Sequence, residues 1–386
     1  MLNFTFQNPT KIIFGRDSIR NLGVELKAYG NRVLLVYGGG SIRRHGLYDT
    51  IIGILKAEGI DWQELSGVQP NPRITSVREG VRLCRDQNLQ VILAVGGGSS
   101  LDCAKAIAAA YYYDGDPWDL VTRKALIRQA LPVAAVLTLA ATGSEMNVNT
   151  VISNDDTLEK YGVGSHFLYP RFSILDPTYT MTVPPEHTAA GIADIISHIL
   201  EQYFSPTEAC EVQDQMAEGF LRVCFTLGPQ LMRDPENYDL RANILWVSTL
   251  ALNGLLGTGR VTDWSCHGIE HVLSARYDIT HGVGLAIITP HWMRRVLNEH
   301  TMPRLCRYAR NVWQLQGEDS PELALAAIDR SAAFFAEIGL GLRLRDCGIE
   351  ENSLSSMADQ AMSNRSLGQF MPLQSEDVLA ILRAAY

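Results

Sequence analysis

The chain has 386 residues, of which 46% are hydrophobic and 19% are charged, and this length allows two domains with sizeable cores. Its formal net charge of −9 argues against nucleic acid or an anionic membrane as the main partner, because both are bound through basic surfaces. The seven cysteines include no C-x-x-C pair, and neither a signal peptide nor a long apolar run is present, so we expect a reduced, soluble, cytoplasmic protein.

Predicted strands and helices alternate in the first half of the chain. A short hairpin is expected at 4–14 and an amphipathic helix at 18–29. Apolar runs predict buried strands at 32–37, 91–96 and 132–145, with a further strand at 61–68. Helical periodicity occupies 47–58, 74–88 and the segment after the glycines at 96–98. This alternation predicts a mainly parallel sheet with helices in an α/β domain.

Helical periodicity dominates the second half, beyond the Pro184-Pro185 pair. Helices are predicted at 189–204, 210–227, 240–257, 264–274, 321–338 and 375–384. We therefore expect an α/β dinucleotide-binding domain at 1–180 and an all-helical metal- and substrate-binding domain at 181–386.

A glycine loop after the strand at 91–96 is a candidate anion site. Gly97, Gly98 and Ser99 open a helix, where free backbone N–H groups and the helix dipole favour a phosphate or pyrophosphate. Ser99 and Asp102 also have the spacing of a capping box, which would make the loop a turn before a capped helix. The two interpretations are compatible.

A similar loop, Gly38-Gly39-Gly40-Ser41, follows the strand at 32–37. Two such loops in one α/β layer favour a dinucleotide, although neither matches G-x-G-x-x-G. No acidic residue directly follows the strand to bind a ribose 2′-hydroxyl. Arg43 and Arg44 lie nearby, so we favour NADP(H) over NAD(H). The alternative is that both arginines belong to a solvated helix face.

Hydroxyl side chains end the third apolar strand of the predicted sheet. Thr138, Thr142 and Ser144 lie where open α/β sheets bind ligands, and they could contact a phosphate or the nicotinamide. Alternatively, these hydroxyls only form hydrogen bonds with backbone groups of a turn. Lys160 is a single lysine in a polar segment that we predict to be a loop.

Candidate metal ligands gather in two segments of the helical half. Asp194 and His198 are four residues apart, as are His267 and His271, and His281 follows. On a helix this spacing places both side chains on one face. Such oxygen and nitrogen ligands suit Zn²⁺ or Fe²⁺. The alternative is a solvated helix face or a hydrogen-bonded buried histidine.

These motifs together resemble the iron-containing (group III) alcohol dehydrogenases. The resemblance rests on GGGSSLD at 96–102, TGSE at 142–145, the Asp194 and His198 pair, and the three later histidines. It runs over essentially the whole chain and is nearest to the butanol dehydrogenase and NADPH-dependent aldehyde reductase branch. It implies a dehydroquinate synthase-like α/β domain, an all-helical metal-binding domain, iron or zinc, and a homodimer.

The resemblance also implies roles for individual residues. The metal ligands would be Asp194, His198, His267 and His281. His271 would assist proton transfer without binding the metal, and Lys160 is a second catalytic candidate. Residues expected to line the cofactor cleft are Gly38, Gly39, Gly40, Ser41, Asn71, Gly97, Gly98, Ser99, Asp102, Thr138, Thr142, Ser144, Lys160 and Tyr179. Many members of the family have Pro-His-Gly at the last ligand, whereas this chain has Thr280-His281-Gly282.

The expected activity is metal-dependent, NAD(P)H-linked oxidation of primary alcohols or reduction of aldehydes of short to medium chain length, such as butanol and butanal. Arg276 is the main basic residue in the two metal segments, so a neutral substrate fits better than an anionic one. Two alternatives stay open: a metal- and NAD-dependent lyase of the 3-dehydroquinate synthase type, and a non-catalytic protein with a closed structural metal site.

Overall fold

The computed structural model describes residues 1–363 and 366–386, and the chain divides into two compact units. One unit comprises Gln7–Val183 and Glu236–Leu245. The other comprises Met1–Phe6, Pro184–Pro235 and Trp246–Tyr386. The division predicted near residue 180 treated each domain as one continuous segment, whereas both units are discontinuous in sequence.

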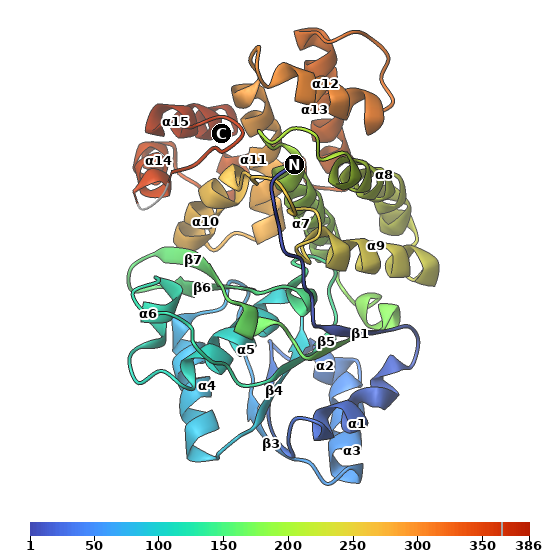
Figure 1. Ribbon diagram of the computed structural model, residues 1–386, viewed down its shortest axis with the longest axis vertical. Coiled ribbons are helices and arrows are strands. Elements are labelled where there is room, and N and C mark those ends of the chain that lie inside the picture. Colours follow the sequence, from blue (N-terminus) through green and yellow to red (C-terminus); the bar gives the residue numbers. More distant parts are fainter. Residues whose placement is uncertain (364–365) are drawn as a thin grey trace. The chain divides into compact units, whose positions relative to one another are not determined.

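The first unit is built on a six-stranded, wholly parallel sheet in the order β1-β8-β5-β4-β2-β3 (Figure 1). Its strands are β1 (Lys11–Phe14), β2 (Arg32–Tyr37), β3 (Asp61–Leu65), β4 (Val91–Gly96), β5 (Val133–Leu137) and β8 (Phe172–Leu175). The central strands β2, β4 and β5 are almost entirely buried, as expected where helices cover both faces of a parallel sheet.

Two apolar cores lie on opposite faces of this sheet. Helices α4 (Ile74–Asp86), α5 (Gly98–Ala110) and α6 (Pro117–Val121) contribute to one core. Helices α1 (Leu22–Lys27), α2 (Ser41–Arg44) and α3 (Leu47–Ala57) contribute to the other. Alternate residues of β2 serve the two cores, with Leu34 in one and Leu35 in the other. This is the period-two alternation of a buried strand.

The chain reverses its direction of travel across the sheet between β2 and β4. From β2 it passes through α2 and α3 to β3 at the sheet edge, and it then returns to β4 on the other side of β2. The loops after β2 and β4 therefore leave neighbouring strands toward opposite faces. Open α/β sheets bind ligands at the carboxyl ends of strands at such a reversal.

Two local predictions for this unit were wrong. The expected hairpin at 4–14 is absent, since β1 pairs instead with β8 in parallel. The strand predicted at 132–145 ends at Leu137, and the chain then forms a turn and the 3-10 helix η2 (Ser144–Met146). An antiparallel pair, β6 (Asn149–Asn154) and β7 (Glu159–Gly164), follows and was not predicted. The remaining 3-10 helices of the unit are η1 (Ser18–Asn21), η3 (His166–Leu168) and η4 (Pro177–Thr180).

The second unit is helical (Figure 1). Its elements, with α9 spanning both units, are α7 (Pro185–Tyr203), α8 (Glu211–Arg233), α9 (Tyr238–Ala251), α10 (Ser265–Tyr277), α11 (His281–Val296), α12 (Met302–Asn311), α13 (Pro321–Glu337), η5 (Leu344–Cys347), η6 (Glu351–Ser353), α14 (Leu354–Met362) and α15 (Ser375–Ala384). Helix α7 is buried on all sides from Thr188 to Tyr203, which is typical of a central helix. Within the described part of the chain, no helix has both the length and the hydropathy that crossing a membrane requires.

Candidate functional site

Helix α7 supplies the first two members of a buried polar cluster. Pro185 at its first turn is well placed, because proline has a helical φ and no N–H to satisfy there. Asp194 and His198 follow one turn apart on the helix, and both are buried. Their neighbours Ile195, Ile196 and Ile199 are also buried, so the two polar groups lie inside the apolar core of this unit.

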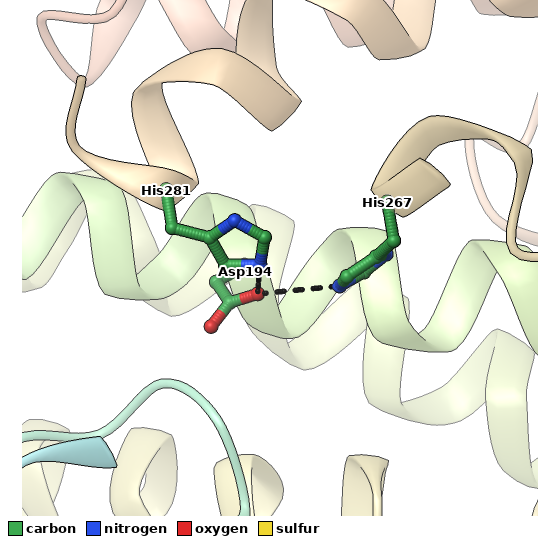
Figure 2. A group of neighbouring side chains, drawn as sticks. All are labelled: Asp194, His267 and His281. Carbon is green, nitrogen blue, oxygen red and sulfur yellow. Dashed lines mark ion pairs between the residues drawn. The ribbon is translucent and has the colours of Figure 1, made fainter. Parts of the chain in front are cut away.

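Helices α10 and α11 bring two further imidazoles to the same place. The Oδ1 atom of Asp194 lies 3.4 Å from Nε2 of His198, 3.7 Å from Nε2 of His267 and 3.6 Å from Nε2 of His281. Figure 2 shows the carboxylate of Asp194 facing the rings of His267 and His281. Donor atoms of these three residues all lie within 4.8 Å of one another.

This spacing fits a shared cation. Ligand bonds of about 2.0–2.2 Å in a tetrahedral zinc site place the ligand atoms about 3.3–3.6 Å apart. Asp194 Oδ1 and His267 Nε2 are also buried without a hydrogen-bond partner among the described residues. Buried polar atoms nearly always have a hydrogen-bond partner, so these two atoms and the ligand types around them fit a metal site.

Two buried glutamates pair with the ring nitrogens of His267 and His281 that face away from Asp194. Glu201, on α7, pairs with Nδ1 of His267, and Glu270, on α10, pairs with Nδ1 of His281. Glu201 also accepts the backbone N–H of Cys266 at 2.6 Å, which ties the start of α10 to α7. Because Nδ1 of each ring pairs with a glutamate, Nε2 is the ring nitrogen that His267 and His281 present to Asp194. Outer carboxylates commonly orient metal-binding histidines in this way.

The electrostatics of the cluster favour an added positive charge. Burial raises the pKa of Asp194, but the three surrounding imidazoles outweigh it and hold that pKa well below its ordinary value. Burial lowers the pKa of His198 to about 3, which keeps this imidazole neutral. Burial also lowers the pKa of His267, but Glu201 and Asp194 prevail and raise it to about 10. Metal binding must displace such a proton, because only a neutral imidazole can coordinate.

His271 lies beside this cluster, one turn after His267 on α10. It is buried, and its ring centre is 5.7 Å from that of His281 and 6.3 Å from that of His267. Its donor atoms group with Glu270 and His281 and not with Asp194. Its predicted role as a residue that assists without binding metal stays a prediction.

Trp264 is a further residue of the cluster that the sequence did not indicate. It precedes α10 with a φ of 86°, a left-handed conformation that is strained for a bulky residue. Its ring centre lies 5.2 Å from that of His267 and 6.3 Å from that of His198. The indole thus forms an apolar wall against both imidazoles.

The other predicted site residues lie in the sheet unit. Most of them follow the carboxyl ends of parallel strands: Gly38 to Ser41 after β2, Gly97 to Ser99 after β4, Thr138, Thr142 and Ser144 after β5, and Tyr179 after β8. Burial raises the pKa of Tyr179 to about 12. The strands are parallel, so these loops share one edge of the sheet, which includes the reversal between β2 and β4.

The glycine loop after β4 is held by side chains from the loop after β5. A Cβ atom on Gly98 would lie 2.4 Å from Cγ2 of Thr142, so only glycine fits there without a shift. The proposed capping box is wrong, because the N-cap residue is Gly97 and no side chain caps the helix. Asp102 instead accepts hydrogen bonds from Ser144 Oγ at 2.7 Å and from the Val151 N–H at 3.0 Å.

Lys160 and Asn71 are neighbours, although 89 residues separate them. Lys160 is not in a loop as predicted but on β7, where it is buried and donates to Oδ1 of Asn71 at 2.8 Å. Asn71 itself has a φ of 52°, a conformation that asparagine tolerates better than most residues. The pair joins β7 to the loop before α4.

Comparisons with known proteins match both halves of the chain to one family. Residues 9–177 match the family model described as iron-containing alcohol dehydrogenase, and residues 188–386 match the C-terminal model of the same family. The chain is 50% identical to NADH-dependent butanol dehydrogenase A of Clostridium acetobutylicum, over all of both chains. It is 39% identical to the NADPH-dependent aldehyde reductase YqhD of Escherichia coli, over 92% of each.

A solved structure has the same fold throughout. The crystal structure of NADH-dependent butanol dehydrogenase A from Thermotoga maritima superimposes with a TM-score of 0.96 at 44% sequence identity. The match covers all of this chain and 99% of that one. The α/β sheet followed by a helical half is thus the architecture of this group.

Proposed function

The chain belongs to the iron-containing alcohol dehydrogenase family and is an NAD(P)-linked oxidoreductase with alcohol dehydrogenase or aldehyde reductase activity, and on that premise we propose how its residues carry out the reaction. The observation that carries the proposal is Asp194 Oδ1 surrounded by three imidazole Nε2 atoms at 3.4–3.7 Å.

We propose that Asp194, His198, His267 and His281 hold one divalent cation, Fe²⁺ or Zn²⁺. Bound there, the cation would supply Lewis acidity toward the oxygen of an alcohol or aldehyde, which would lower the pKa of the alcohol hydroxyl. Glu201 and Glu270 keep the Nε2 atoms of His267 and His281 in place. His271, beside His281, carries the hydroxyl proton to or from the substrate on a ring nitrogen.

We propose that the nucleotide binds at the carboxyl edge of the sheet. The N–H groups of Gly97 to Ser99 at the start of α5 take the pyrophosphate. The loop Gly38 to Ser41 takes the adenosine ribose, and the other predicted contacts of Asn71, Asp102, Thr138, Thr142, Ser144, Lys160 and Tyr179 complete the site. The cofactor supplies the hydride, and the protein supplies its position.

The substrates we propose are neutral primary alcohols and aldehydes of short to medium chain length, with butanal as the test case. The structure supports a neutral substrate, since Arg276 is already engaged. Its guanidinium donates to Gln360 Oε1 at 2.6 Å and to Ser356 Oγ at 2.7 Å. The lyase and the non-catalytic alternatives considered from the sequence are not supported by the relatives.

Cofactor preference, location and assembly are also proposals. The sequence favoured NADP(H), and the names of the relatives divide between NADH and NADPH. A cytoplasmic location is supported by seven free cysteines, all within the described residues.

A homodimer is supported by the exposed apolar side chains of Met1, Leu2, Phe4 and Phe6, because such patches commonly mark interfaces. Light scattering that gives a monomeric mass would exclude the dimer.

The experiment that tests the function compares butanal-dependent oxidation of NADPH and NADH by native, chelator-stripped and metal-restored enzyme. We expect turnover to disappear on stripping and to return with Zn²⁺ or Fe²⁺. His198→Ala should lose the metal and the activity but still bind the dinucleotide. The control is His187→Ala, on the exposed first turn of the same helix. Wild-type turnover by His198→Ala would show that the metal assignment is wrong.

A further inference from the structure

A carboxylate from a neighbouring strand lies at the centre of a polar cluster near the loop after β2. Glu64, on β3, accepts the hydroxyl of Tyr37 at 2.6 Å and the hydroxyl of Tyr48 at 2.6 Å. The indole N–H of Trp62 donates to the same carboxylate at 3.3 Å. Although burial raises the pKa of Glu64, these hydrogen bonds and Arg43 keep it below its ordinary value, so the group is ionised at neutral pH.

The two arginines of α2 differ sharply in their surroundings. Arg43 donates from Nη2 to Glu64 Oε2 at 2.8 Å, and its guanidinium carbon lies 3.7 Å from the ring centre of Tyr48. Arg44 has no ion pair with any described residue, and its Nη1 lies 3.9 Å from the position that a Cβ of Gly40 would take. The charge of Arg43 is therefore compensated and fixed, whereas that of Arg44 is free.

This cluster adjoins the loop assigned above to the adenosine ribose. Arg43 and Arg44 belong to α2, which begins directly after Gly38, Gly39 and Gly40. NADPH differs from NADH only by a 2′-phosphate on that ribose. In dinucleotide-binding sheets an acidic side chain near this point favours the 2′-hydroxyl, and an arginine accommodates the phosphate. The chain has no acidic residue directly after β2, but Glu64 brings one from the adjacent strand β3.

We propose that Glu64 sets the selectivity between NADH and NADPH by neutralising Arg43. The inference rests on the proposed nucleotide site. The side chains of Arg43 and Glu64 are 49% and 28% exposed, so water moderates their fields and the effect is one of several-fold selectivity, not of all-or-none binding. Arg44 supplies the remaining attraction for the phosphate.

The test uses Glu64→Gln, Arg43→Gln and the double variant in the full-length enzyme. Adenosine 2′,5′-bisphosphate and 5′-AMP differ only by the 2′-phosphate, so the ratio of their dissociation constants measures selectivity without metal or substrate. We expect Glu64→Gln to shift this ratio toward the bisphosphate by about threefold to tenfold at low ionic strength. Arg43→Gln should shift it in the opposite direction, and the double variant should return it close to the wild-type value.

Several controls separate charge from shape. Glu58→Gln removes the same charge from a glutamate that pairs with Lys27 at 2.6 Å and should leave the ratio unchanged. High salt should reduce the shift given by Glu64→Gln, and the ratio of kcat/KM for NADPH over NADH should move in the same direction. An unchanged ratio, or equal weakening of both nucleotides, would overturn the inference. Failure of the wild-type enzyme to bind either nucleotide would overturn the proposed nucleotide site as well.

Discussion

Gly282→Ala should weaken metal binding through a backbone collision. Gly282 follows His281 at the start of α11, and a Cβ there would lie 1.9 Å from the carbonyl oxygen of Ala190 on α7. Ordinary van der Waals contact begins at 3.4 Å, so the two helices must separate locally by about 1.5 Å, the kind of backbone shift that overpacking causes. His281 Nε2 is 3.6 Å from Asp194 Oδ1, and that shift would take it out of ligand range.

We expect this collision to lower both the stability of the protein and its affinity for the metal. Overpacking costs about 1–3 kcal/mol, and a collision with a backbone oxygen lies toward the upper end of this range, at about 2–3 kcal/mol. The better helix propensity of alanine returns about 1 kcal/mol, so we expect a net loss of about 1–2 kcal/mol in the free energy of unfolding. Loss of the groups that orient a metal ligand typically weakens metal binding by about 10- to 100-fold, and we expect a loss of this order when Gly282→Ala displaces His281.

The assay is a Zn²⁺ titration against a competing chelator, together with urea unfolding of the chelator-stripped protein. Gly219→Ala in α8 is the control, because the nearest atom to its added Cβ is Arg222 Nη2, at 3.8 Å. That variant should bind Zn²⁺ normally and lose no stability. Wild-type Zn²⁺ affinity and stability in Gly282→Ala would refute the idea that close approach of α11 to α7 positions His281.

Two further predictions concern buried charges. Glu201→Gln should bind Zn²⁺ about 10- to 100-fold more weakly in the same chelator competition, because a carboxamide orients His267 less strongly than a carboxylate does. An unchanged Zn²⁺ affinity would show that Glu201 does not orient His267 for metal binding. Lys105 is fully buried and donates to Asn147 O and Asn149 O, both at 2.9 Å, and burial lowers its pKa from 10.5 to about 8. Between these two pKa values the unfolded chain binds more protons than the folded one, so the free energy of unfolding rises with pH. From pH ~7.5 to ~9.5, the free energy of unfolding of the wild type should therefore rise by about 2 kcal/mol relative to that of Lys105→Met. Urea unfolding at both pH values measures the difference, and a pH-independent difference would contradict the prediction.

The sequence predicted elements well where one local signal dominates. The apolar runs at β2 and β4, each followed by glycines, indicated the central strands correctly. Helix α11 was missed, because two early glycines and Pro290 inside it weaken the helical pattern. The hairpin expected at 4–14 was wrong for another reason. The partner of β1 is β8, about 160 residues later in the chain, and local periodicity carries no information on such pairing.

The candidate metal ligands could be found because the i, i+4 spacing of Asp194 and His198 is a local pattern. Glu201 and Glu270 were missed, since a glutamate on a helix is usually solvent-exposed. One signal was available: Glu201 lies among Ile199, Leu200 and Tyr203 on an apolar helix, where a free carboxylate is costly to bury. The pairing of Glu64 on β3 with Arg43 on α2 joins two separate elements. The local sequence of neither element could predict it.

The candidate metal cluster holds three buried carboxylates, those of Asp194, Glu201 and Glu270, and their burial bears on how the helices around it are stabilised. The basic groups that pair with them in that cluster include the imidazoles of His198, His267 and His281, which are neutral unless protonated. Buried carboxylates are costly without compensating charge. One proton on His267 compensates part of the charge, and a divalent cation at Asp194 would compensate more without requiring that proton. If the cation binds as proposed, its binding is coupled to the folding of α7, α10 and α11, and the same carboxylates that orient the ligands would make the stability of these helices depend on the cation.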